Sequence, residues 1–244
     1  MRIFAIADLH LCFGTPKKSM ELFGPAWANY AERIKDNWQK KIEDQDLVLI
    51  PGDLSWAMKM QEALVDLQWI DQLPGVKVIV RGNHDYWWQS SAKLKENLPP
   101  SIHAVHNDVF NYQGVSIAGS RLWNSSEYNF SEYIDYKINP NAKEKIETDD
   151  EKVFRKELLR LKLSLDQLDQ KAAIKICLTH FPPIGTALEQ SKARLMMEQA
   201  NVNFSVFGHL HNLKSKNLFG EKNNINYILC SADYIDFDPV EIKY

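Results

Sequence analysis

The feature that most constrains this 244-residue chain is a series of short apolar runs, several of which are followed at once by aspartate, asparagine or histidine. The runs are rich in β-branched residues and span 3–7, 46–50, 76–80, 115–119, 174–178, 204–207 and 227–230. Such runs are typical of strands, and their nearly continuous apolarity favours burial on both faces. We therefore expect a buried sheet core whose strand ends carry polar side chains.

Helical patterns lie between these runs. The first helix is expected to begin at Pro25, because proline suits the first helical position. Its apolar side chains recur every three or four residues and comprise Trp27, Tyr30, Ile34, Trp38 and Ile42. A second helix is expected over 61–73, and a third after the capping-box pair Thr148 and Glu151. The alternation of strands and helices predicts an α/β layered fold in one domain, residues 1–244.

Residues 121–147 are the least regular part of the chain. They combine many polar residues with five aromatic ones, Trp123, Tyr128, Phe130, Tyr133 and Tyr136, and show no sustained period. A segment of this kind is either a lid or insertion over a site or a packed surface loop. Both interpretations stay open at this point.

Composition and net charge limit the kinds of partner that we expect this chain to bind. A formal net charge of -3 leaves no general excess of positive charge, so binding of long nucleic acids is not expected. No apolar stretch approaches the roughly 20 residues of a membrane span. The three cysteines, Cys12, Cys177 and Cys230, stand far apart, which fits reduced core residues and a cytoplasmic protein. We expect no membrane association.

The polar residues that follow the strands form five motifs. These are Asp8-Leu9-His10, Gly52-Asp53, Gly82-Asn83-His84-Asp85, Thr179-His180 and Gly208-His209-Leu210-His211. Ligands in open α/β sheets bind beyond the carboxyl ends of strands. Five of the seven histidines fall in these motifs. Imidazole and carboxylate together suit zinc, manganese, iron or nickel better than calcium, so the motifs predict a metal site.

Each motif alone is weak, since Gly-Asp after a strand is usually a turn. Together and in this order they resemble the calcineurin-like metallophosphoesterase superfamily, in its bacterial predicted phosphohydrolases. The resemblance implies a four-layer α/β/β/α sandwich of two mixed β-sheets flanked by helices, with two divalent metal ions. One ion would be bound by Asp8, His10, Asp53 and His211, and the other by Asp53, Asn83, His180 and His209. Mn²⁺ is the ion we expect to work best in vitro, with iron, zinc and nickel as alternatives.

The resemblance also implies roles in the reaction. His84 would be a catalytic proton donor or transition-state stabiliser, and Asp85 would orient it and favour its charged form. Arg81 and Asn83 would contact the substrate phosphate. Tyr86, Trp87 and Trp88, which follow directly, would either form an aromatic wall of the site or pack beneath it.

The expected activity is hydrolysis of a phosphomonoester or phosphodiester by attack of a metal-bound hydroxide. The expected partner is a small-molecule phosphoester. A non-catalytic scaffold of the same fold, a nuclease and a protein phosphatase are the alternatives.

Overall fold

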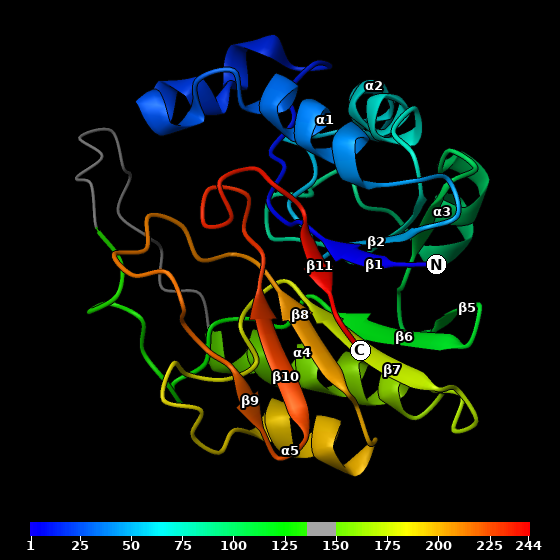
Figure 1. Ribbon diagram of the computed structural model, residues 1–244, viewed down its shortest axis with the longest axis vertical. Coiled ribbons are helices and arrows are strands. Elements are labelled where there is room, and N and C mark those ends of the chain that lie inside the picture. Colours follow the sequence, from blue (N-terminus) through cyan, green and yellow to red (C-terminus); the bar gives the residue numbers. More distant parts are fainter. Residues whose placement is uncertain (136–149) are drawn as a thin grey trace.

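The strands are arranged in two sheets, one above the other in Figure 1. The computed structural model of the chain describes residues 1–135 and 150–244. The first sheet has the order β11-β1-β2-β3-β4, with bounds Val240–Ile242, Ile3–Ala5, Leu47–Ile50, Val76–Ile79 and Ile102–Ala104. The second has the order β5-β6-β7-β8-β10-β9, with bounds Phe110–Tyr112, Val115–Ser120, Ile174–Thr179, Phe204–Phe207, Ile225–Leu229 and Glu221–Lys222.

Both sheets are mixed. Strands β1 to β4 run parallel in the first sheet, and β11 pairs with β1 antiparallel. In the second sheet β6, β7, β8 and β10 run parallel, whereas β5 and β9 are antiparallel to their neighbours. The parallel strands bring their carboxyl ends to one edge of each sheet.

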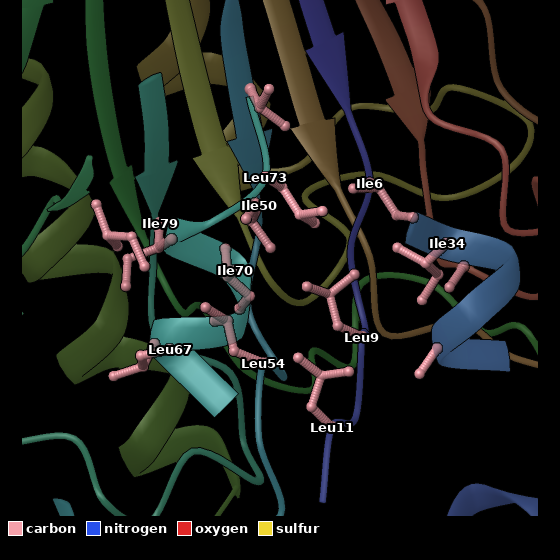
Figure 2. Packing of buried hydrophobic residues seen from close by; sticks show 14 of the residues in the cluster. Ile6, Leu9, Leu11, Ile34, Ile50, Leu54, Leu67, Ile70, Leu73 and Ile79 are labelled. Atoms are coloured by element: carbon pink, nitrogen blue, oxygen red, sulfur yellow. The ribbon is translucent and has the colours of Figure 1, made fainter. Parts of the chain in front are cut away.

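Helices cover the outer face of each sheet. Helices α1 (Tyr30–Lys41), α2 (Met60–Asp71) and α3 (Ser91–Asn97) lie over the first sheet, while α4 (Asp150–Leu165) and α5 (Lys192–Gln199) lie over the second (Figure 1). Figure 2 shows the apolar packing under α1 and α2, where Ile34, Leu67 and Ile70 contact the first sheet's cluster. A separate buried cluster fills the space between the sheets. The predicted four-layer sandwich is confirmed.

The helix predicted from Pro25 begins later than expected. Pro25–Trp27 forms a 3-10 turn, and Asn29 adopts a left-handed conformation with φ of 51° before α1 starts at Tyr30. The apolar stripe is nevertheless used, because Trp27, Tyr30, Ile34, Trp38 and Ile42 are all buried in one cluster. The second predicted helix corresponds to α2. The predicted cap residue Thr148 lies outside the described residues.

Four strands were not predicted, and all four are sheet edges. Strands β4, β5, β9 and β11 are only two or three residues long. Strands β5, β9 and β11 carry exposed polar side chains, and His103 on β4 is half-buried, since an edge strand is covered less than a central one. The apolar signal that identified the central strands is therefore too weak at the edges.

No helix in the described ranges is long and apolar enough to cross a membrane. Cys12, Cys177 and Cys230 are free thiols, as the sequence predicted, and Cys177 and Cys230 are buried.

Candidate metal centre

The five motifs lie at the carboxyl ends of parallel strands from both sheets. Strands β1, β2 and β3 lead to Asp8, Asp53 and Asn83, and strands β7 and β8 lead to His180 and His209. Because the two sheets pack face to face, these ends meet at one rim of the sandwich.

The backbone is strained where it turns to present the ligands. Asp8, His10, Asp53 and His209 have φ of 60°, 46°, 53° and 72°, in the left-handed region. Non-glycine residues rarely adopt this conformation, and such strain is concentrated at functional sites. Two motif glycines permit the close contact of neighbouring turns, since a Cβ on Gly82 would collide with Asp53 and one on Gly208 with Asp8. The motifs thus need their glycines for space.

Asp8, His10 and His211 form the first group of donor atoms. His10 Nε2 lies 3.4 Å from His211 Nε2, which is 3.7 Å from Asp8 Oδ1. All three donor atoms fall within 4.8 Å of one another, close enough to bind one ion.

A second group surrounds the ring of His180. Its Nε2 lies 2.7 Å from Asn83 Oδ1, 3.3 Å from His209 Nδ1 and 3.5 Å from Asp53 Oδ2. The same Asp53 oxygen is 3.7 Å from His10 Nε2 in the first group. Asp8 also belongs geometrically to both groups, since its carboxylate lies within reach of His180 as well as of His211. The seven residues predicted as ligands are therefore brought together.

Hydrogen bonds fix the orientation of two of the imidazoles. Nδ1 of His180 lies 3.0 Å from the carbonyl oxygen of Pro51, to which it can donate a hydrogen bond. The lone pair of Nε2 is then free to bind a metal. Nδ1 of His211 lies 2.7 Å from Asp233 Oδ1, which leaves the Nε2 of His211 facing the first group.

Asp233 is a residue that the sequence reasoning missed. It follows strand β10 (Ile225–Leu229) by four positions, and so carries the same signal as the other motifs, a carboxylate shortly after an apolar run. The signal was present, but the five-motif pattern ends before it.

The charges of the site fit a bound cation. Burial raises the pKa of Asp8 to about 6. Burial, and then the charges of Asp85 and Asp8, raise the pKa of Asp53 well above its usual range. Burial lowers the pKa of His10 and of His180, so both rings are neutral, as metal ligands must be. Burial also lowers the pKa of His211, but the charges of Asp233 and Asp8 outweigh it and raise that pKa, so the ring of His211 would lose a proton on binding an ion. A cation would relieve the cost of ionising these crowded carboxylates.

An unpaired buried atom supports the same fit. Asp8 Oδ1 is buried and has no hydrogen-bond partner within the described residues. Buried carboxylate oxygens are normally paired, and a metal is one partner that restores the pairing. Carboxylate, amide and neutral imidazole donors are compatible with manganese, iron, zinc or nickel.

His84 lies in a pocket of about 240 Å³ over the first group, lined also by His10, Asp53 and His211. Its ring centroid is 4.4 Å from that of Trp56, which itself stacks on His10 at 4.8 Å. Burial, and then the positive charge of His211, lower the pKa of His84 to about 4. The ring is therefore neutral here, in contrast to the charged form that we expected.

We expected Asp85 to orient His84, but Asp85 is hydrogen-bonded elsewhere. Its carboxylate accepts hydrogen bonds from the backbone amides of Asp53, Leu54, Ser55 and Gly82 and from Trp87 Nε1. It therefore ties the turn after β2 to the turn after β3. The imidazole of His84 is held instead among aromatic rings.

Arg81 and the two tryptophans lie outside the pocket of His84. Arg81 lines a different, small cavity with Arg121, Glu157 and Arg160. The structure thus gives no support to Arg81 as a phosphate ligand of the metal centre. Trp87 and Trp88 are buried in the core cluster beneath the motifs, so the packing interpretation holds for these two. Tyr86 is exposed, and its ring centroid lies 6.4 Å from that of His84.

A family model described as calcineurin-like phosphoesterase matches residues 1–213. The chain belongs to this family. Calcineurin-like phosphoesterases are generally hydrolases and typically bind divalent metals, which agrees with the donor groups at the rim. No curated protein gives a significant match.

Solved structures are similar to this chain at low sequence identity. GAP50, the anchor in the inner membrane complex of Plasmodium, is 13% identical with a TM-score of 0.51, over 96% of this chain and 72% of that one. A purple acid phosphatase from yellow lupin (Lupinus luteus) seeds is 14% identical with a TM-score of 0.49, over 96% and 44%. A protein of unknown function from Aquifex aeolicus is 16% identical with a TM-score of 0.47, over 98% and 95%.

Proposed function

We propose that the chain hydrolyses phosphoesters of small molecules, monoesters or diesters, with the help of two divalent metal ions. The observation that carries this proposal is the pair of donor groups with an Asp53 oxygen between them, at the base of a pocket that also contains His84. Paired metal sites with such donors are used to displace an oxygen from phosphorus.

Seven residues would hold the ions. Asp8, His10 and His211 would hold one, and Asn83, His180 and His209 the other, with Asp53 contacting both. Bound divalent ions would supply Lewis acidity, which neutralises phosphoryl charge and makes a water molecule more acidic. The protein's part is to keep the donor atoms close together before any ion arrives, through the strained turns and the oriented imidazoles.

His84 would act on the phosphoryl group or the leaving oxygen. A neutral imidazole retains one N–H, which can donate a hydrogen bond to a phosphoryl oxygen. The ring contact with Trp56 and the hydrogen bond from the His84 backbone amide to Asp53 Oδ1, 2.8 Å long, hold this residue at the edge of the centre. His84 therefore has the position of a catalytic residue without being a ligand.

The test compares His84→Ala with wild type on p-nitrophenyl phosphate and its bis ester in the presence of Mn²⁺. We expect kcat to fall about 10²- to 10³-fold, because a positioned donor is lost in the transition state. Metal content by elemental analysis should be unchanged. His103→Ala is the matched control, since His103 lies on β4, outside the pocket of His84.

Two outcomes would contradict the proposal in different ways. Full activity in His84→Ala would show that His84 takes no part in the reaction, while the proposed hydrolase activity would stand. A wild-type protein that is loaded with metal but hydrolyses neither ester nor a wider panel would instead favour a non-catalytic scaffold.

A further inference from the structure

A second cavity lies directly beside the metal centre. It has a volume of about 660 Å³, and His209, one of the expected ligands, lines it. The segment 123–130 supplies most of the remaining lining, together with Phe181 and Pro182. We call this the aromatic cavity. Its volume is in the range of sites that hold whole small molecules.

Aromatic rings line the cavity and lead towards the metal centre. The ring centroids of Trp123 and Phe181 are 4.8 Å apart, and those of Phe181 and His209 are 3.8 Å apart. Tyr128 and Phe130 form another ring pair at 5.5 Å. Rings arranged in this way offer apolar surfaces to a flat molecule.

Polar contacts hold two of the lining rings, those of Trp123 and Tyr128, in place. Trp123 Nε1 donates to Asp150 Oδ1 at 2.8 Å, and the Arg121 guanidinium lies 4.5 Å from the ring of Trp123. Tyr128 Oη donates to the carbonyl of Pro182 at 2.6 Å. The rings are therefore anchored before a ligand enters, which lowers the entropic cost of binding.

The polar part of the lining is neutral. Asn124, Ser125, Ser126 and Asn129 contribute amides and hydroxyls, and within residues 1–135 and 150–244 no aspartate, glutamate, lysine or arginine lines the cavity. Amides can both donate and accept, which matches the mixed edge of a heterocyclic base. A phosphopeptide, with charged groups on either side of its phosphate, finds no matching charges here.

We propose that the aromatic cavity receives the organic part of the substrate, and that this part contains a planar, uncharged heteroaromatic ring such as a nucleobase. The phosphoester would then extend past His209 to the metal centre. The proposal rests on the proposed function for the hydrolytic step, whereas ring binding in the cavity can be measured without it.

The test uses two substrates with Mn²⁺-loaded protein, adenosine 5′-monophosphate and ribose 5-phosphate. Both contain a ribose 5-phosphate group, and only the first carries a base. We expect KM to be about tenfold lower for the nucleotide, as expected for one base–aromatic contact. Phe130→Ala should raise KM for the nucleotide several-fold and leave that for ribose 5-phosphate unchanged. Phe110→Ala is the matched control, because Phe110 is also half-buried but lies on β5, outside both cavities.

A binding measurement separates the two proposals. Calorimetry with adenosine should show binding to wild type and to Phe110→Ala, and weaker binding to Phe130→Ala. Equal KM values for the two substrates, an equal effect of Phe130→Ala on both, or no adenosine binding would overturn the inference. Adenosine binding without hydrolysis of any ester would support the cavity and overturn the proposed function.

Discussion

The two sheets hold their ends of the metal centre in different ways. At the first sheet, the fully buried carboxylate of Asp85 accepts four backbone amides from two turns, and so fixes the course of the chain itself. At the second sheet, Asp233 lies against one side chain, that of His211, and accepts one backbone amide, from Asn212. Asp85 thus fixes the backbone of two turns, whereas Asp233 orients the ring of His211.

We therefore expect loss of Asp85 to lower the stability of the fold, and loss of Asp233 to lower the affinity for metal. Loss of Asp85 would leave buried amides without acceptors, which destabilises the folded state whether or not metal is present. Loss of Asp233 would change mainly the basicity and orientation of His211. Burial lowers the pKa of His211, but the charges of Asp233 and Asp8 outweigh it and raise that pKa to about 9.

The largest effect is expected for Asp85→Asn. The amide side chain has one acceptor oxygen in place of two, so its NH₂ group would face backbone donors, each left unpaired at a cost of about 1–3 kcal/mol. We expect the free energy of unfolding of the metal-free protein to fall by about 3 kcal/mol or more, measured by urea denaturation.

Asp166→Asn serves as the control for this change, because Asp166 is exposed on the surface and pairs with Lys162. It should alter stability by less than about 0.5 kcal/mol. An Asp85→Asn protein as stable as this control would show that the two turns are held together by something else.

Asp233→Asn is expected to have an intermediate effect of another kind. The partner of a ligating imidazole typically contributes about 10- to 100-fold in metal affinity, so Mn²⁺ binding should weaken by that factor. The unfolding midpoint of the metal-free protein should change little, because few backbone groups depend on Asp233. A large loss of stability with unchanged metal affinity would reverse the proposed contrast between the two sheets.

The smallest effect is expected for Arg81→Gln. Arg81 lines the small cavity between the sheets' ends with Arg121 and Arg160, and its Nε has no hydrogen-bond partner in the described part of the chain. We expect kcat/KM to change less than about twofold, because Arg81 lines this cavity and not the pocket of His84. A tenfold loss with unchanged metal content would restore Arg81 as a phosphate-binding residue.

The sequence predicted the candidate ligands better than the residues that hold those ligands in position. Asp8, Asp53 and His180 follow buried apolar runs, and parallel strands bring such positions together. The partners of Asp85 are backbone amides, which every residue carries, so no pattern of side chains reveals them. The edge strands were missed because they are short, and the aromatic cavity because its rings come from a segment without a period, 121–135, and from Phe181 after β7.

The ligands from the first sheet are separated from His211 by most of the length of the chain, and the candidate centre brings the two together at the seam of the sandwich. Ions bound there would act as cross-links between the layers. By mass action, a free ion concentration 100 times its dissociation constant would add about 2.7 kcal/mol of stability. The amount of folded protein, and not only its turnover, would then follow the supply of metal.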